Sequence, residues 1–163
     1  MMAAGEHARL ATAADLGSIG AIADTIAAEM ADHRGGALFL RRESGGDAAR
    51  RAAALLDTGD ATDGSGFVVV GTYDDVPFGY ALVQIEELGD GGRLARIDDL
   101  AVEAEARGSG IGEAIMNLVL DQAKVRGCFG VDSRALPGDR HTKNFFESFG
   151  LKARMLVVHK ALD

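Results

Sequence analysis

Three glycines alternate in the stretch that follows Arg107. Gly108, Gly110 and Gly112 lie between an apolar strand-like run and a run of helical spacing that includes Ile111. A helix N-terminus presents unpaired N–H groups and a partial positive charge, which attract anions. Glycines let an anion approach the backbone closely, and the arginine adds a charged donor. The pattern predicts a phosphate-binding loop, and the alternative is a turn that happens to contain glycines.

Two familiar phosphate-binding motifs do not fit this loop. A Walker A loop ends in Gly-Lys-Ser/Thr, whereas this loop continues from Gly112 into Glu113 and Ala114. A dinucleotide fingerprint has the spacing G-x-G-x-x-G, but the sixth position counted from Gly108 is Glu113. That fingerprint also belongs in a first βαβ unit, and here the glycines come late in the chain. An unrelated α/β nucleotide binder stays open as a hypothesis.

Two adjacent acids, Asp98 and Asp99, lie in the predicted strand 93–102, just before the glycines. A carboxylate can take a proton from a reacting group as a general base. Strand alternation predicts that Asp98 shares a face with Leu100 and Val102. Asp99 is then expected on the opposite face, with Ile97. The alternative for either acid is a solvated side chain or a salt-bridge partner.

The elements that must position these residues follow from hydrophobic periodicity and turn signals. Thr12 and Asp15 resemble a capping box in front of the first helix, and residues 32–44 fit no single element. Asp74 and Asp75 predict a hairpin turn. The expected strands are 7–11, 67–73, 77–88, 93–102, 128–135 and 153–162, and the expected helices are 16–30, 46–57, 111–126 and 140–149. Residues 57–66 are predicted to form a polar loop. The order predicts an α/β (α+β) single domain over residues 1–163, a mixed sheet with helices on both faces.

Composition excludes several classes of protein. The chain has 163 residues and a formal net charge of −8, which argues against a nucleic-acid binder. Its one cysteine, Cys128, allows no internal disulfide and falls in a predicted buried strand. No apolar run approaches the ~18 residues of a membrane span, and the N-terminus has no signal-peptide pattern. A cytoplasmic protein is therefore expected.

Residues 107–112, with the sequence RGSGIG, fit the R/Q-x-x-G-x-G/A signature of the GNAT superfamily of N-acetyltransferases. Residues 144–151, NFFESFGL, resemble the second hallmark of that family, N/F-Y-E-x-x-G-F. Residues 10–22 are similar to its opening strand and first helix. The resemblance covers nearly the whole chain apart from residues 32–66.

This resemblance implies a splayed mixed sheet that binds acetyl-CoA as cosubstrate. The pyrophosphate would lie on the N–H groups of residues 107–112, and the pantetheine arm would pair with the strand edge like an added strand. The amide near Leu100 could polarise the thioester carbonyl. The cofactor-binding residues so implied are Leu100, Ala101, Val102, Arg107, Gly108, Ser109, Gly110, Ile111, Gly112, Asn144 and Phe146.

The activity implied by the resemblance is direct transfer of acetyl to a primary amine of a small molecule or a protein. Asp98 falls where polyamine-type members carry a catalytic glutamate, and Asp99 is the neighbouring candidate. The hairpin acids, among them Glu86, would suit a cationic acceptor. Phe146 occupies the position of a tyrosine that protonates the leaving thiolate in many members, so a non-catalytic acyl-CoA-binding module is the alternative. No metal, nucleic acid or membrane is implied, and a homodimer is compatible with the family.

Overall fold

One five-stranded mixed sheet organises the fold. The computed structural model describes residues 5–42, 47–57 and 64–162. Neighbouring strands follow chain order, antiparallel up to the fourth strand, and the fifth is parallel to the fourth. The strands are β1 (Glu6–Leu10), β2 (Gly66–Tyr73), β3 (Val76–Glu87), β4 (Arg93–Val102) and β5 (Gly130–Asp132).

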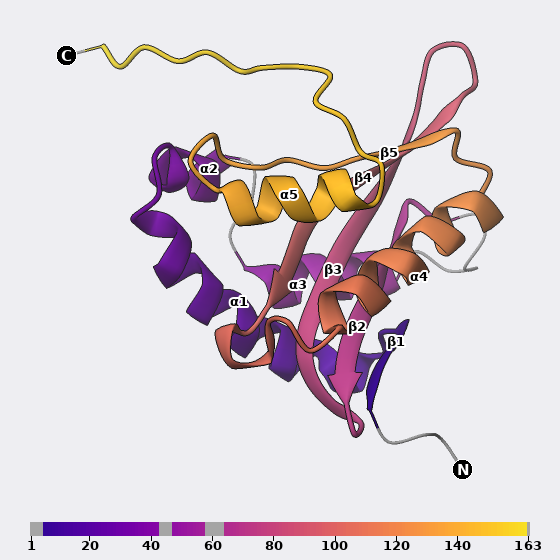
Figure 1. The fold of residues 1–163 in the computed structure, drawn as a ribbon. Helices are drawn as coiled ribbons and strands as arrows, with labels where there is room; N and C mark the ends of the chain where they lie inside the picture. Colours follow the sequence, from indigo (N-terminus) through magenta and orange to yellow (C-terminus); the bar gives the residue numbers. More distant parts are fainter. Residues whose placement is uncertain (1–4, 43–46, 58–63, 163) are drawn as a thin grey trace.

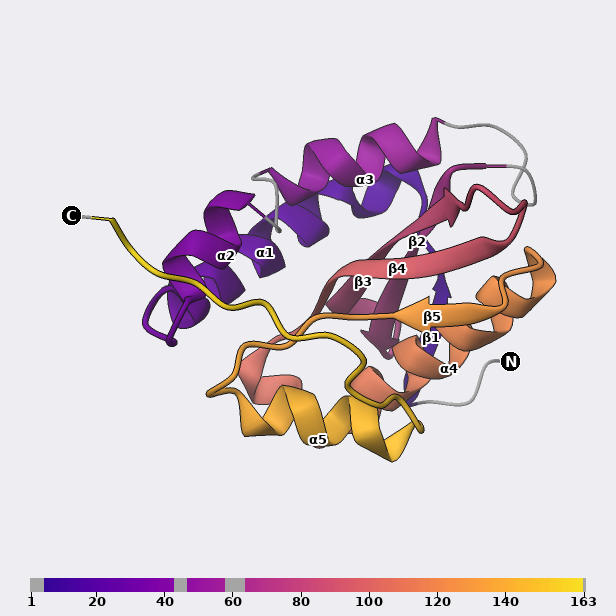
Figure 2. The ribbon, with the colours of Figure 1, turned by 90° about the horizontal axis from the view of Figure 1, so that it is seen from above.

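Helices cover both faces of this sheet, as Figures 1 and 2 show. One layer holds α1 (Leu16–Ala31), α2 (Gly36–Arg42) and α3 (Ala48–Leu56). The other layer holds α4 (Ile111–Val125) and α5 (Arg140–Ser148). Two short 3₁₀ turns, η1 (Ala13–Asp15) and η2 (Ala104–Ala106), precede α1 and α4. The predicted fold class is therefore confirmed.

Two hydrophobic clusters lie on opposite faces of the sheet. Along β2, Phe67 and Val69 pack in the cluster that includes α4, whereas Val68 and Val70 pack in the cluster that includes α1 and α3. A continuous apolar run, rather than an alternating one, is expected of a strand buried on both faces. The sequence FVVV thus fits a position inside a three-layer fold.

The predicted capping box and the predicted hairpin turn are both present in the structure. The Asp15 carboxylate accepts a hydrogen bond from the Thr12 N–H at 2.8 Å and binds the Arg9 guanidinium at 2.8 Å. The hydrogen bond from Arg9 is the main cause that lowers the pKa of Asp15. Asp74 and Asp75 both have positive φ, 47° and 66°, as the right-handed twist of a tight hairpin requires.

The last predicted strand is wrong. Residues 153–162 form no strand, the fifth strand is only Gly130–Asp132 rather than 128–135, and residues 36–42 form a helix that was not predicted. A strand exists only where a neighbouring backbone completes its hydrogen bonds, and the chain after α5 has no such neighbour among the described residues. The predicted polar loop at 57–66 lies mostly outside the described residues.

The predicted faces of β4 also need correction. Leu82 pairs with Asp99 and Val83 with Ile97, so Asp98 is the extra residue of a β-bulge. Ile97 packs in the same cluster as Leu100, whereas simple alternation had placed them on opposite faces. The extra residue shifts the alternation by one position, which sequence periodicity does not reveal.

We predict that Gly71→Ala lowers the free energy of unfolding by about 1–3 kcal/mol through overpacking. A β-carbon at Gly71 would lie 2.6 Å from the side chain of Ile111 and 2.7 Å from that of Ile115. Gly89→Ala is the control, because a β-carbon there meets nothing within 4 Å. Urea denaturation measures both, and equal stability of the two variants would contradict the predicted packing.

Candidate functional site

The glycine loop (residues 107–112) joins η2 to α4. Gly108 and Gly110 have positive φ, 80° and 95°, a conformation that favours glycine. Gly110 is the N-cap of α4. These two glycines turn the chain sharply, and the first amides of α4 consequently point out of the helix end.

The amides at this helix end have no acceptor within the described part of the chain. The structure records none for the N–H groups of Gly108, Gly110, Ile111, Gly112 and Glu113. The first N–H groups of any helix lack intrahelical partners and are free for a ligand or water. Together with the helix dipole they form a cradle that suits a phosphate.

Arg107 does not point freely into this cradle. Its Nε donates to the Val102 carbonyl at 3.0 Å, and its Nη2 forms an ion pair with Glu29 of α1 at 2.7 Å. The hydroxyl of Ser109 donates to the Ala106 carbonyl. Arg107 therefore connects the glycine loop to α1 and to the end of β4, a role that sequence reasoning missed.

The outer edge of β4 is open where it approaches the glycine loop. β5 pairs with β4 only at residues 94–96, and no described strand pairs with this edge of β4 after residue 96. The Glu103 N–H donates to the Phe78 carbonyl at 2.9 Å. By antiparallel alternation, the backbone groups of Leu100 and Val102 then point away from β3, to the open edge.

Asp98 is buried and held by two arginines. Its Oδ1 accepts from Arg96 Nε at 2.6 Å and from Arg134 Nη2 at 3.1 Å, and only 6% of the side chain is exposed. The hydrogen bond to Asp98 is the main cause that raises the pKa of Arg96. The Arg134 guanidinium also lies 5.6 Å from the ring centroid of Phe39 in α2.

Asp99 belongs to a separate set of contacts. The Arg51 guanidinium of α3 binds both of its oxygens, at 2.7 and 3.2 Å, and the Tyr80 hydroxyl donates to Oδ2 at 3.1 Å. Burial, and secondarily the Asp99 charge, raises the pKa of Tyr80 well above its ordinary value. The sequence did carry a signal for Arg51, because it lies at helical spacing from the buried Ala48 and from Leu55.

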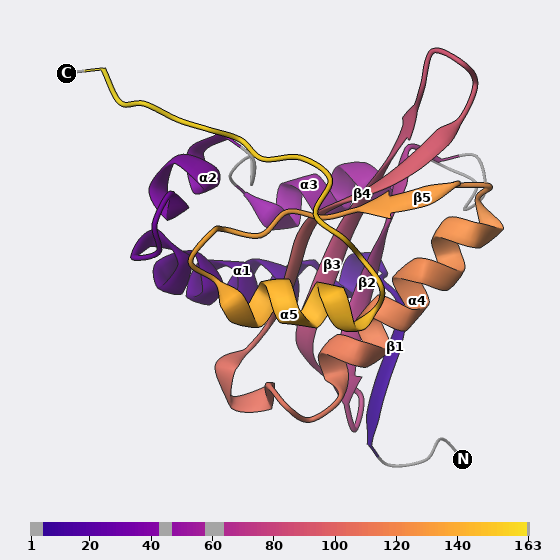
Figure 3. The same ribbon diagram turned by 45° about the horizontal axis from the view of Figure 1, so that its top comes forward.

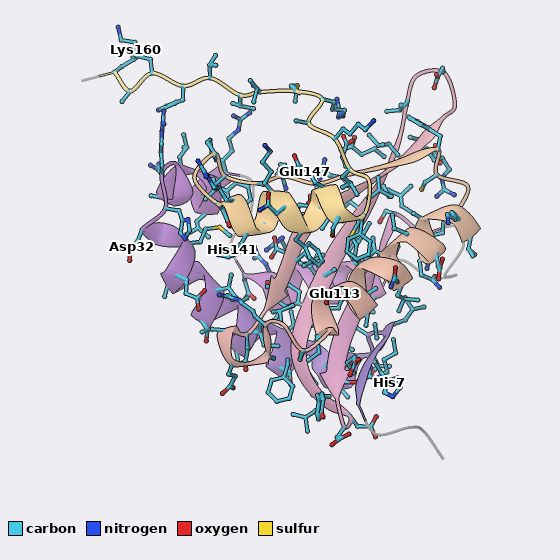
Figure 4. The ribbon with its side chains drawn as sticks, in the orientation of Figure 1. His7, Asp32, Glu113, His141, Glu147 and Lys160 are labelled. Carbon is cyan, nitrogen blue, oxygen red and sulfur yellow. The ribbon has the colours of Figure 1, made fainter. Side chains whose placement is uncertain are left out.

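The residues expected on α5 lie in different environments. Phe146 is buried in the core that includes α4, with its ring centroid 5.5 Å from that of Phe145. A β-carbon at Gly112 would lie 3.3 Å from the Phe145 ring, so it is Phe145 that approaches the glycine loop. Asn144 and His141 are exposed, and Figure 4 labels His141 at the start of this helix. Cofactor contacts of Asn144 and Phe146 stay predictions.

Other expected features have ordinary structural contacts. Glu86 binds Arg96, and Asp74 accepts from the Gly5 N–H at 3.0 Å. Cys128 is half-buried, and burial raises the pKa of its thiol. Within the described ranges no helix could cross a membrane, and no group of three or more metal-ligating side chains is found.

Comparisons with known proteins identify relatives of this chain. The profile of the Acetyltransferase (GNAT) family matches residues 27–151. The chain is 34% identical over 59 residues to glucosamine 6-phosphate N-acetyltransferase 1 of Oryza sativa subsp. japonica, and this match covers 36% of each protein. The matched segment thus spans about a third of that relative.

Solved structures resemble the whole fold. A glucosamine-6-phosphate N-acetyltransferase from Arabidopsis thaliana has a TM-score of 0.66 at 20% identity, covering 97% of this chain and 99% of its own. A variant of the BH1408 protein from Bacillus halodurans has a TM-score of 0.78 at 18% identity, covering 95% and 98%. At such identities the likeness shows the fold alone.

We predict that Tyr80→Phe changes the alkaline part of the stability profile. Because the folded-state pKa of Tyr80 is raised, its stabilising effect is complete below the unfolded value of about 10 and is lost as pH rises above it. Stability of the wild type should fall above this pH, and Tyr80→Phe should weaken that fall.

The control is Tyr73→Phe, since Tyr73 is the other tyrosine of the chain and is exposed. At neutral pH, Tyr80→Phe should cost about 1.5–3 kcal/mol, as expected for a hydrogen bond to a charged group, and Tyr73→Phe about 0.5 or less. Denaturant unfolding between neutral and alkaline pH measures both effects. Identical profiles for the two variants would disprove the assigned contact.

Proposed function

Because the chain belongs to the Acetyltransferase (GNAT) family, we propose that it transfers an acetyl group from acetyl-CoA directly to a primary amine. The observation that carries the proposal is the row of free amides in the glycine loop, which directly follows the open edge of β4. An open strand edge that is followed along the chain by a phosphate cradle suits a long ligand that has an amide-containing arm and a pyrophosphate.

The end of β4 and the glycine loop meet at a junction, and the residues on its two sides have distinct proposed roles. The free amides of Gly108 and of residues 110–113 hold the pyrophosphate, while the backbone of Leu100 and Val102 pairs with the pantetheine amides. The Val102 carbonyl already accepts from Arg107, so the remaining groups for this pairing are the Val102 N–H and those of Leu100. The thioester then lies near the bulge at Asp98.

The acceptor is proposed to approach from the side of Asp98. This acid is linked through Arg134 to α2. The amine nitrogen attacks the thioester carbonyl carbon, the new C–N bond forms, the C–S bond breaks, and the electron pair leaves with the CoA thiolate. A protonated amine has no lone pair, so before the attack it loses one proton, which Asp98 accepts through a water. After the attack the nitrogen loses a second proton to solvent, and solvent returns a proton to the thiolate.

No described side chain near the junction is assigned as the acid for the thiolate. Phe146 has no proton to give, and the Tyr80 hydroxyl is a poor acid because its pKa is raised by burial. Cys128 is likewise assigned no covalent role, since burial raises the pKa of its thiol and a thiolate is the nucleophilic form. Direct transfer is the chemistry that these residues support.

The acceptor class is proposed only as a primary amine, on a small molecule or a protein. The names of the rice and Arabidopsis relatives specify an amino sugar phosphate. A cationic amine is the other class to test, although Arg51, Arg96 and Arg134 already balance the acids Asp98 and Asp99. A panel of glucosamine 6-phosphate, polyamines and peptide N-termini separates these classes by thiol release.

We predict that Gly108→Asp weakens acetyl-CoA binding at least ~10-fold, which corresponds to about 1.4 kcal/mol. A β-carbon at Gly108 meets nothing within 4 Å, so the added carboxylate has room; the positive φ strains any side chain there, and the charge in addition repels the phosphates. Gly108→Asn has the same shape without the charge and should weaken binding less. Calorimetry with acetyl-CoA measures both.

Gly127→Asp is the matched control, because Gly127 also has positive φ and open space but lies at the other end of α4. Its affinity for acetyl-CoA should equal that of the wild type. If Gly108→Asp and Gly127→Asp bind equally well, the phosphate assignment of the glycine loop is wrong.

We predict that Asp98→Asn lowers kcat by ~10²–10⁴-fold, the usual contribution of a general base. The loss should shrink at high pH, where more of the amine is already deprotonated, and acetyl-CoA affinity should stay unchanged. Asp99→Asn is the comparison, since Asp99 contacts Arg51 and Tyr80 instead. Asp99→Asn should lower the stability of the protein, and it should lower kcat per folded molecule less than Asp98→Asn does.

Full activity of Asp98→Asn across the pH range would remove Asp98 from the mechanism. Acetyl-CoA binding by the wild type without turnover of any amine in the panel would favour the alternative of a non-catalytic acyl-CoA-binding module.

A further inference from the structure

The segment between β5 and α5 (residues 133–139) lies beside α2. Figures 1 and 3 show this segment leaving β5 and running toward α2 before α5 begins. A β-carbon at Gly35, just before α2, would lie 3.9 Å from the Leu136 side chain. The Arg134 guanidinium lies 5.6 Å from the ring centroid of Phe39. Arg134 therefore extends from a segment that contacts α2 to the buried acid on β4.

The two oxygens of the Asp98 carboxylate are held unequally. Oδ1 accepts from Arg96 Nε at 2.6 Å and from Arg134 Nη2 at 3.1 Å. From the described residues, Oδ2 accepts only from Arg96 Nη2 at 3.4 Å, which is longer than the usual ~2.7–3.2 Å of such a bond. The two short donors thus fix Oδ1, and Oδ2 has lone pairs left for another donor.

The neighbouring acid, Asp99, has no such difference between its oxygens. Arg51 donates to Oδ1 at 3.2 Å and to Oδ2 at 2.7 Å, and the Tyr80 hydroxyl also donates to Oδ2 at 3.1 Å. A planar guanidinium that binds both oxygens in this way is a strong, directional partner. A proton arriving at either oxygen of Asp99 would compete with a donor already in place, whereas Oδ2 of Asp98 can accept one.

Arg134 accounts for the unequal oxygens of Asp98. Arg96 offers Nε and Nη2 to the same carboxylate, and such a fork by itself favours two parallel bonds of similar length. Arg96 also donates to Glu86 and Gln84 of β3, which holds its guanidinium in place. A second guanidinium that binds Oδ1 alone rotates the carboxylate toward Oδ1, and the bond from Arg96 to Oδ2 is consequently long.

We propose that Arg134 is a positioning residue, which anchors Oδ1 of Asp98 so that Oδ2 is the oxygen that accepts the amine proton. An N–H bond of the ammonium breaks, its electron pair stays on nitrogen, and a water passes a proton to Oδ2, from which it returns to solvent after turnover. The Phe39 ring contributes to holding Arg134, as expected of a cation within ~6 Å of a ring centroid. This inference rests on the proposed acetyl transfer.

A double-mutant cycle tests whether Arg134 acts through Asp98. Arg134→Met removes the donor at similar side-chain length and leaves the pair between Arg96 and Asp98, so the variant is expected to fold. Its kcat should fall ~10–100-fold, as for a misplaced catalytic group, with unchanged circular dichroism and acetyl-CoA affinity. In an Asp98→Asn background, Arg134→Met should change kcat less than ~2-fold, because no base is left to position.

Two further variants separate positioning from a general structural contribution. Arg134→Lys should recover most of the lost kcat, because an ammonium can also donate to Oδ1. Arg154→Met is the matched control, since Arg154 likewise binds an acid of the β5 region, Asp132, but does not contact Asp98. Its kcat should equal that of the wild type.

Three results would overturn the inference: wild-type kcat in Arg134→Met, an equal loss in Arg134→Lys, or a loss that is the same with and without the carboxylate of Asp98. Each of these leaves turnover by the wild type intact. Failure of the proposed function is recognised differently, because the wild type then releases no thiol with any amine of the panel, and this inference falls with it.

Discussion

Parallel pairing between β4 and β5 stops at Arg96, and the candidate site depends on this stop. Asp98, two residues later, is the extra residue of a bulge, and bulges increase twist and redirect side chains. β4 therefore begins between two strands and ends with an open edge. Only Glu103 and η2 separate that edge from the glycine loop. The bulge at Asp98 therefore sets the positions of the open edge, the two acids and the free amides relative to one another.

Burial of two acids at this bulge requires compensation. An unpaired buried charge costs several kcal/mol, about 3–5 when one partner of a buried pair is removed. Arg96 comes from β4 itself, Arg51 from α3 and Arg134 from the segment after β5. The site thereby depends on three separate parts of the chain, two of which contain no recognisable motif. Arg107 adds a further link, from the glycine loop to α1.

The two edge strands of the sheet, β1 and β5, have different surroundings. At β1, the edge strand is short, and Arg9 and Asp15 form an ion pair beside it. At β5, the strand has three residues and an apolar groove next to it. Exposed edges with apolar surroundings favour pairing with another chain. Residues 152–162 belong to neither hydrophobic cluster.

The sequence by itself determined the features that depend on neighbouring residues. The bounds of β4, the start of α4 after Gly110 and the hairpin at Asp74 and Asp75 follow from alternation, helical spacing and turn chemistry, which act over a few residues. The tertiary structure alone decided that the bulge shifts the faces of β4, because a bulge exists only against the register of β3. It likewise decided that Arg51 and Tyr80 hold Asp99, and that residues 153–162 form no strand. Ion pairs between distant segments and strand formation both require a partner, and the local pattern of a sequence does not specify where that partner lies.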